Sequence, residues 1–241
     1  MPATPSHDLP FDRPEAFLEG QVMVIDKPLT WTSFDVVNKV RYALRGFTGA
    51  KKIKVGHAGT LDPLATGILI LCIGKKTKEI NKIQEKNKTY LATIKVGEST
   101  PSYDRETEID NIYPTSHINE ELIMDSIKSF RGKSEQTPPV YSALKIDGKR
   151  SYELARKGEK IIPKKREIEI FKFNLLNFKN LEIDCEIECS KGTYIRSIAS
   201  DMGKKLDSGA YLKYLERYSV GEYSIKNCLQ IDEIKDLISL Q

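Results

Sequence analysis

The strictest constraint on the fold is an alternation of side chains between Leu181 and Cys189. Every second residue there is apolar, and the four residues between them are acidic: Glu182, Asp184, Glu186 and Glu188. Because successive side chains of a β-strand point to opposite faces, this pattern predicts a strand with one buried face and one solvated face. Such a strand is typical of an antiparallel sheet.

Further strands are expected at residues 21–26, 68–73, 89–96, 140–144, 166–176 and 214–223. Helices are expected from Thr32 to Gly46, from Glu120 to Phe130, over 151–157, from Tyr194 to Leu206 and over 231–240. Thr32, with an aspartate three residues later, has the pattern of a capping box. Since strands and helices are interspersed without regular strand–helix–strand alternation, we predict an α+β fold. Its sheet is expected to be mixed, mostly antiparallel and flanked by helices.

Composition excludes several classes of protein. The chain has 241 residues, of which 39% are hydrophobic, and no apolar stretch approaches the roughly 18 residues of a membrane span. The first 20 residues contain four prolines and lack the pattern of a signal peptide, so a cytoplasmic protein is expected. The four cysteines form no C-x-x-C pair, and the histidines lack ligand spacing. We therefore expect buried, reduced thiols and no metal.

Basic residues gather in three places, although the net charge is only +4. Two lysine groups lie at 51–54 and 75–78, and a longer basic segment runs from Lys145 to Arg166. Any one group could be ordinary solvated surface. Three groups beside glycine-rich turns favour a phosphate-bearing partner.

The segment from Gly56 to Gly67 is a tight loop that carries two candidate functional side chains, His57 and Asp62. Taken alone, Asp62 before a proline is a common start of a turn, and His57 could be an ordinary loop histidine. The loop is not a phosphate-binding P-loop, because six residues separate Gly67 from the next glycine and the hydroxyl residue is missing.

Residues 56–78, GHAGTLDPLATGILILCIGKKTK, resemble the catalytic segment of the bacterial tRNA pseudouridine(55) synthases of the TruB type, relatives of the dyskerin-type synthases. Four more segments match this family in the expected order: 24–28, 88–90, 141–145 and 189–196. The resemblance extends from about Gly20 to Tyr223 and implies the pseudouridine synthase fold. The 141–145 segment and the basic insert behind it favour the stand-alone bacterial branch over the guide-dependent one.

The resemblance implies an isomerase that converts the uridine of the TΨC loop, position 55 of tRNA, to pseudouridine without a cofactor. Asp62 corresponds to the aspartate that attacks or deprotonates the flipped nucleoside. Arg196 corresponds to the arginine that pairs with this aspartate, and Tyr90 to the tyrosine that stacks on the uracil. Without this context, Arg196 would be read as a surface ion pair and Tyr90 as core.

Supporting residues follow from the same resemblance. His57 matches the histidine that packs in the emptied RNA loop, and Tyr194 and Leu215 match residues that line the pocket. Lys27 and Asp104 match supporting polar positions. The insert at about 139–167 resembles the thumb that closes on the RNA. A solvated surface loop would have a similar sequence.

The implied organisation is an extension over residues 1–20 and a catalytic domain over 21–241. The C-terminal RNA-binding domain of many relatives is expected to be missing or reduced to 231–241. Two departures from the family pattern are a missing acid in the segment 100–104 and Glu216 in place of an arginine. We expect a monomer that binds the T-arm of tRNA and needs no protein partner. The alternatives are an RNA-binding or tRNA-folding module and a subunit of a guide-RNA particle.

Overall fold

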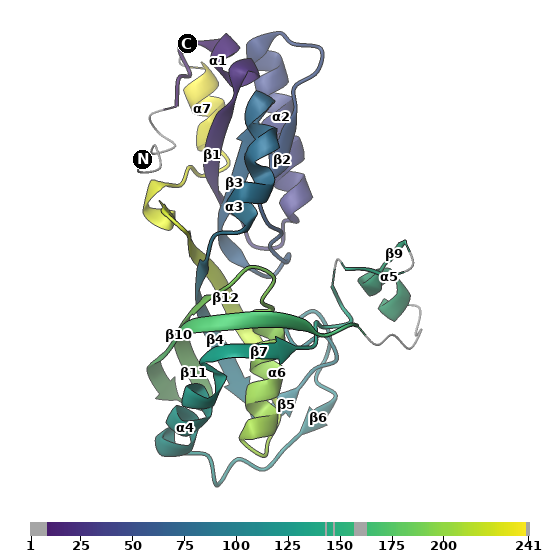
Figure 1. Cartoon of the computed structure of the whole chain (residues 1–241), viewed down its shortest axis with the longest axis vertical. Coiled ribbons are helices and arrows are strands. Elements are labelled where there is room, and N and C mark those ends of the chain that lie inside the picture. Colours follow the sequence, from purple (N-terminus) through teal and green to yellow (C-terminus); the bar gives the residue numbers. More distant parts are fainter. Residues whose placement is uncertain (1–8, 143, 147, 157–162, 240–241) are drawn as a thin grey trace. The chain divides into compact units, whose positions relative to one another are not determined.

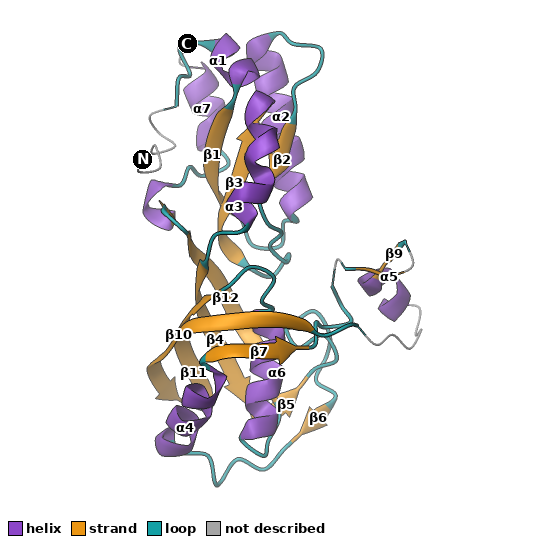
Figure 2. Cartoon of the chain, viewed as in Figure 1, coloured by secondary structure: helices purple, strands orange, loops and turns teal. Residues whose placement is uncertain are grey.

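The computed structural model describes residues 9–142, 144–146, 148–156 and 163–239. The chain forms two compact units, drawn in Figures 1 and 2. The first comprises the chain up to Tyr90 together with the segment from Glu216 onward, and the second comprises Leu91–Leu215. No helix in the described part of the chain has the length and apolar character that crossing a bilayer requires.

Strand β3 (Thr66–Ile73) is the centre of the first unit. It pairs antiparallel with β1 (Gln21–Lys27) and, at its C-terminal end, with β2 (Val55–His57). At its other end it pairs in parallel with β12 (Ala210–Val220), whose neighbour is β13 (Tyr223–Ser224). Seven of the eight residues of β3 are buried, so both faces of the strand must be covered.

Helix α2 (Ser33–Thr48) covers one of these faces. Its capping box, formed by Thr32 and Asp35, is present as predicted. The prediction that this helix ends at Gly46 is wrong. The helix continues to Thr48 and is capped by Gly49 at φ 64°. An interior glycine costs only about 1 kcal/mol, which core packing of the helix outweighs. The left-handed conformation is the one that requires glycine.

The N-terminal segment is part of the core of the first unit. Leu9, Phe11 and Phe17 are buried in the same cluster as the inner face of α2, and the rings of Phe11 and Phe17 lie 5.2 Å apart. Helix α1 (Pro14–Glu19) packs against α2, as does the terminal helix α7 (Glu233–Ser239). The opposite face of the sheet is covered by α3 (Ile80–Gln84), which follows η2 (Gly74–Glu79), and by η3 (Ile225–Asn227).

The sheet of the second unit contains five strands. Their order across the sheet is β12, β4 (Lys88–Val96), β11 (Glu182–Cys189), β10 (Arg166–Lys179) and β7 (Gly132–Gln136). The alternation in β11 is confirmed, since its apolar side chains are buried and its acidic ones are partly exposed. Helices α4 (Glu120–Phe130) and α6 (Ile195–Lys205) lie where predicted, and α4 packs against β10. A small sheet joins β5 (Glu98–Ser99) and β6 (Asn111–Ile112).

One predicted strand is wrong. Residues 140–142 and 144 are not in a strand, and the edge strand is β7, earlier in the chain. The sequence of β7, Gly-Lys-Ser-Glu-Gln, has no apolar alternation, because an edge strand gains its stability mainly from backbone pairing with β10. The insert that follows contains β8 (Lys145–Ile146), β9 (Lys149–Arg150) and α5 (Ser151–Arg156). Lys157 and Lys160 of the basic segment lie outside the described residues.

The expectation of reduced thiols is confirmed: all four cysteines are free and buried. Burial raises the pKa of Cys185 to about 12, so this thiol stays protonated at neutral pH.

Candidate active site

The loop that carries Asp62 is held through its backbone. The Ser33 hydroxyl donates to the carbonyl of Leu61 at 3.1 Å and accepts from the amide of Leu61 at 2.8 Å. The amide of Thr30 donates to the carbonyl of Pro63 at 2.8 Å. The amide of Ala65 donates to the backbone carbonyl of Asp62 at 3.0 Å. The residues on both sides of Asp62 are therefore fixed, while its own side chain is only half-buried.

Arg217 is buried beneath the same loop, at 2% exposure. Its guanidinium donates to the carbonyls of Ile68 at 2.8 Å, Gly59 at 3.1 Å and Thr60 at 3.4 Å. It is also hydrogen-bonded to Tyr90. Burial lowers the pKa of Arg217, whereas the interactions with Tyr90 and Asp62 raise it. Arginine nevertheless stays protonated at neutral pH.

Gly67 lets β12 approach the loop closely. It pairs with Arg217 in the parallel contact of β3 with β12, and its φ is 92°. A Cβ atom at this position would collide with the backbone of Arg217. Glycine is required here by both the conformation and the space, and it brings the arginine under the loop that carries Asp62.

Lys27 is a further buried cation beside this loop. Its ammonium group donates to the carbonyls of Trp31 at 2.6 Å, Pro28 at 2.8 Å and Pro63 at 3.3 Å, which uses all three of its protons. Burial lowers the pKa of Lys27 to about 8, while the negative charge of Asp62 opposes this shift. Lys27 therefore holds the loop through the carbonyl of Pro63, and its role at the site remains a prediction.

Two aromatic residues complete the group in the first unit. His57 ends β2, is half-buried, and has a lowered pKa, first because of burial and second because of the charge of Arg217. It is therefore neutral at pH 7. Tyr90 is 8% exposed and lies on β4, with its hydroxyl engaged by Arg217.

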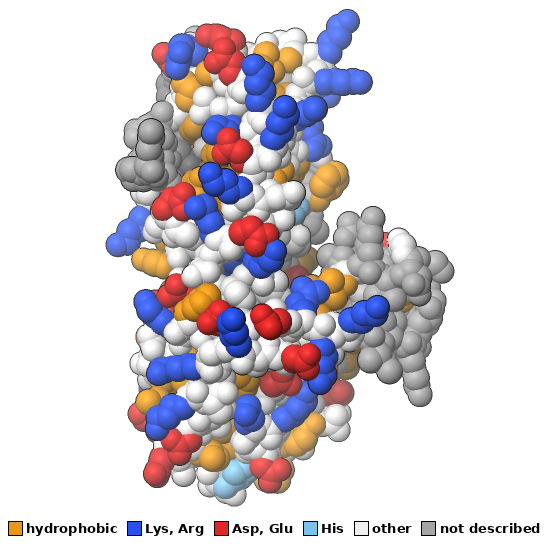
Figure 3. Space-filling model, in the orientation of Figure 1, with side chains coloured by type: hydrophobic (Ala, Val, Ile, Leu, Met, Phe, Trp, Pro, Cys, Tyr) orange, Lys and Arg blue, Asp and Glu red, His pale blue; other side chains and the backbone are white. Residues whose placement is uncertain are grey.

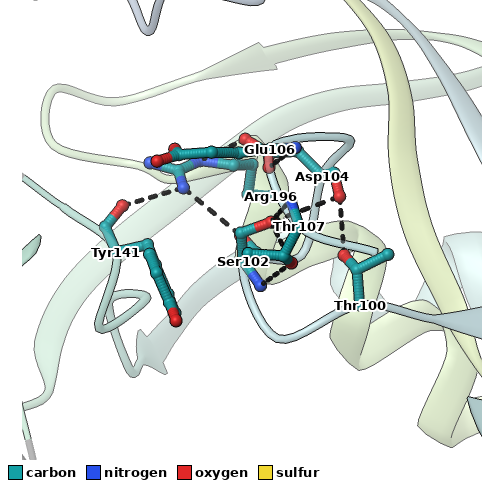
Figure 4. Close-up of polar contacts among 7 residues, drawn as sticks. All are labelled: Thr100, Ser102, Asp104, Glu106, Thr107, Tyr141 and Arg196. Carbon is teal, nitrogen blue, oxygen red and sulfur yellow. Dashed lines mark hydrogen bonds and ion pairs between the residues drawn. The ribbon is translucent and has the colours of Figure 1, made fainter. Parts of the chain in front are cut away.

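The second unit holds a separate polar cluster around Arg196, shown in Figure 4. Arg196 is 3% exposed and donates to the carbonyls of Tyr141 at 2.8 Å and Ser102 at 3.3 Å. Its Nε lies 3.5 Å from a carboxylate oxygen of Asp104. The other oxygen of Asp104 accepts from the amide of Glu106 at 2.9 Å. The buried carboxylate is thus both ion-paired and hydrogen-bonded.

The missing acid in the segment 100–104 does not leave this cluster loose. The hydroxyl of Thr100 donates to the carbonyl of Asp104 at 2.6 Å, and the hydroxyl of Ser102 donates to the same carbonyl at 3.2 Å. Ser102 also shares a 2.8 Å hydrogen bond with the hydroxyl of Thr107. The hydroxyl groups of these three residues therefore supply the hydrogen bonds that order the loop 100–107, next to Arg196 (Figure 4).

Tyr194 and Leu215 are the remaining predicted residues. Tyr194 precedes α6, and its backbone amide donates to the side-chain oxygen of Gln136 at 2.8 Å. Leu215 is 8% exposed on β12. Four predicted residues thus lie in each unit: Lys27, His57, Asp62 and Tyr90 in the first, Asp104, Tyr194, Arg196 and Leu215 in the second. The pairing of Arg196 with Asp62 remains a prediction.

Sequence reasoning missed Ser33 and Arg217, which hold the loop, and Gln136, which holds Tyr194. No sequence signal distinguishes the buried Arg217 from the exposed lysines and arginines around it. Many of those cations are surface residues, as the mixture of blue and red side chains in Figure 3 shows. Lys172, for example, pairs with Glu188 at 3.3 Å, and Lys165 of the basic insert pairs with Glu135 at 3.6 Å.

The fold places the chain in a known structural class. It superposes on the crystal structure of a Cbf5–Nop10–Gar1 complex with a TM-score of 0.70, covering 98% of this chain and 58% of that chain at 22% identity. An H/ACA RNP bound to a substrate RNA containing 2′-deoxyuridine gives a TM-score of 0.67 at 20% identity, covering 98% of this chain and 57% of that one. The architecture is the pseudouridine synthase fold.

The sequence comparisons are more specific. Residues 45–195 match the family model of the TruB family pseudouridylate synthase, N-terminal domain. The tRNA pseudouridine synthase B of Parabacteroides distasonis is 52% identical over 222 residues, covering 92% of this chain and 94% of that protein. The tRNA pseudouridine synthase B of Flavobacterium johnsoniae is 52% identical over 219 residues, covering 90% and 96%. The chain belongs to the TruB family of pseudouridylate synthases.

Proposed function

We propose that this enzyme converts the uridine at position 55, in the TΨC loop of tRNA, to pseudouridine, with Asp62 as its catalytic carboxylate. The support is membership of the TruB family together with the names of the relatives at about half identity. The observation that carries the assignment of Asp62 is its loop. Ser33, Lys27 and Arg217 fix the carbonyls around Asp62 and leave its side chain half-exposed.

The reaction is an isomerisation, so it needs neither a redox partner nor a group donor. The bond between C1′ and N1 of the uridine breaks, the detached uracil turns, and C5 bonds to C1′. The proton on C5 is then lost, and N1 gains one. Asp62 acts on the nucleoside as a nucleophile or as a base, and a carboxylate can perform either task without a cofactor.

The buried cations give this loop its electrostatic character. The ammonium group of Lys27 and the guanidinium of Arg217 both interact attractively with the negative charge of Asp62. Because their donors are bonded to backbone carbonyls, these cations do not have to reorganise when the substrate binds. Preorganised charge of this kind is the usual source of transition-state stabilisation.

The remaining residues are proposed to hold the extruded base and the RNA. Tyr90 stacks on the flipped uracil, and Tyr194 and Leu215 line its pocket. His57, which is neutral at pH 7, packs in the space that the base leaves in the RNA. Arg196 and Asp104 form a buried polar pair that supports the substrate. No cofactor or metal is required.

We further propose that the chain works in the cytoplasm as a monomer on the T-arm of tRNA, without a guide RNA or protein partner. Several structural neighbours are complexes with Nop10 or Gar1, so a requirement for partners is the alternative to be tested. An RNA-folding module without catalysis is the other alternative.

The test uses the purified chain alone with an unmodified tRNA transcript, and pseudouridine is mapped by position. We expect modification of the TΨC-loop uridine and none in a transcript that carries cytidine at that position. No modification of either transcript would contradict the stand-alone enzyme. Modification at another uridine would contradict the proposed position.

A further inference from the structure

Two residues mark the base of the thumb-like insert, residues 139–167, in the second unit. Gln136 is the last residue of β7, where the chain leaves the sheet, and Arg166 is the first residue of β10, where it returns. The two are directly opposite each other in the antiparallel register. Both of them contact the segment that contains Tyr194.

Gln136 holds the backbone of Tyr194 from both sides. Its side-chain oxygen accepts from the amide of Tyr194 at 2.8 Å, and its side-chain nitrogen donates to the carbonyl of Tyr194 at 3.0 Å. Gln136 is buried, with only 4% of its surface exposed. A carboxamide both donates and accepts, so among side chains of this size glutamine alone satisfies both backbone groups at once.

Arg166 holds the side chain of Tyr194. The centre of its guanidinium lies 5.2 Å from the centroid of the tyrosine ring, within the range of a cation–π contact. Its Nη1 also donates to the carbonyl of Gly192 at 3.3 Å. A Cβ atom on Gly192 would lie 3.2 Å from that nitrogen, and the φ of this glycine is 78°. The turn before Tyr194 is thus shaped to admit the arginine.

The segment between β7 and the insert also contacts α6. The carbonyl of Thr137 accepts from the hydroxyl of Ser197 at 2.8 Å, and the carbonyl of Tyr141 accepts from Arg196. The N-cap and first turn of α6 are therefore bonded to Gln136, Thr137 and Tyr141, along the segment that leads from β7 into the insert.

We propose that Gln136 and Arg166 are positioning residues that set the orientation of Tyr194 for the target base. The base of the insert, and not only the part that would contact RNA, then determines the rate of the reaction. This inference rests on the proposed function, because it takes Tyr194 as part of the uridine pocket. Because Arg166 lies over the tyrosine ring, its loss should change the rate of the reaction and leave the affinity for RNA unchanged.

The first test separates rate from affinity. Arg166→Met is compared with Lys128→Met, a loss of one charge outside the insert, at a side chain that is 64% exposed on α4. Loss of a cation–π contact and one hydrogen bond is expected to slow the single-turnover rate about tenfold. The Kd for tRNA should stay close to the wild-type value. Lys128→Met should match wild type in rate. A raised Kd with an unchanged rate for Arg166→Met would overturn the inference.

The second test asks whether Arg166 acts through Tyr194. Arg166→Met is combined with Tyr194→Leu, which removes the ring beneath the guanidinium. The inference predicts that Arg166→Met has no further effect on the rate in the Tyr194→Leu background. If the two substitutions slow the rate independently, so that their effects multiply, Arg166 has a different role and the inference is wrong.

Gln136→Glu gives a third measurement, because it preserves size and one acceptor but removes the donor to the Tyr194 carbonyl. We expect a slower rate with an unchanged Kd, while circular dichroism confirms that the variant is folded. If Gln136→Glu does not fold, the half-buried member of the pair, Arg166, decides the question through the two tests above. Inactive wild type would overturn the proposed function and this inference together. Active wild type with equally active variants would overturn this inference alone.

Discussion

In the interior of the first unit, the guanidinium of Arg217 is hydrogen-bonded to Tyr90. The same guanidinium binds the carbonyls of Gly59 and Thr60, just before Asp62. One buried cation therefore connects the tyrosine proposed to stack on the base with the loop of the proposed catalytic carboxylate.

We predict that Arg217→Met destabilises the protein more than Tyr90→Phe. The first change leaves three carbonyls without their donor and should cost about 3 kcal/mol or more. The second removes only the hydroxyl and should cost about 1 kcal/mol. Urea unfolding of both variants measures the difference. An equal loss of unfolding free energy in the two variants would show that Arg217 stabilises the protein only through its contact with Tyr90.

Ser33→Ala should slow the reaction without loss of RNA affinity. The substitution removes both hydrogen bonds to Leu61 and frees the residue before Asp62, at a cost of about 1–2 kcal/mol of stability. The control is Ser129→Ala, which removes a similar hydrogen bond within α4 of the second unit. Single-turnover rates for the two variants are compared. A rate for Ser33→Ala equal to that of the control would show that the loop does not need this anchor.

Lys27 should give stability a specific pH dependence. Its pKa is about 8 in the folded protein and near 10.5 when unfolded, so the unfolded state binds more protons between these values. The free energy of unfolding of wild type, relative to Lys27→Met, should therefore rise as the pH rises from 8 to 10.5. The limiting slope is about 1.4 kcal/mol per pH unit.

Denaturant unfolding at several pH values checks this prediction. The control is Lys128→Met, at a side chain that is 64% exposed on α4 and pairs with Asp125. Its difference from wild type should change little over the same range. A difference between wild type and Lys27→Met that falls or stays constant would contradict the lowered pKa.

The segment before β1 should be required for stability. Phe17 is fully buried and contacts the rings of Phe11 and Phe47 at centroid distances of 5.2 and 6.0 Å. Phe17→Ala should cost about 3–5 kcal/mol by leaving a cavity in this cluster. Leu18→Ala, next to it but 39% exposed, is the control and should cost little. Similar losses, read from thermal unfolding, would mean that the N-terminal segment is not part of the core.

Elements with strong local patterns could be predicted from the sequence. The alternation in β11 fixed which side chains are buried, and α4 was predicted to the residue. Strand β7 could not be predicted, because a polar edge strand is defined by its partner β10 and not by its own side chains. The end of α2 was placed too early because packing against the core overrides the low helix propensity of Gly46.

For the candidate site, the sequence indicated the residues proposed to touch the substrate but not those that hold them. Asp62, Tyr90 and Arg196 lie in recognisable motifs. Arg217 and Gln136 act through backbone carbonyls and amides that are distant in the chain, so their partners depend on the tertiary fold. A side chain that binds backbone places no demand on the identity of its partner residue, and the sequence therefore carries no paired signal.

The most direct test of the central proposal compares wild type, Asp62→Asn and Asp125→Asn under single-turnover conditions with an unmodified tRNA transcript. Asp62→Asn preserves size and removes the nucleophilic or basic carboxylate, while Asp125→Asn removes an exposed carboxylate on α4. We predict pseudouridine in the TΨC loop with wild type and Asp125→Asn, and none with Asp62→Asn, at similar RNA affinity. Formation of pseudouridine by Asp62→Asn at the wild-type rate would contradict the proposal.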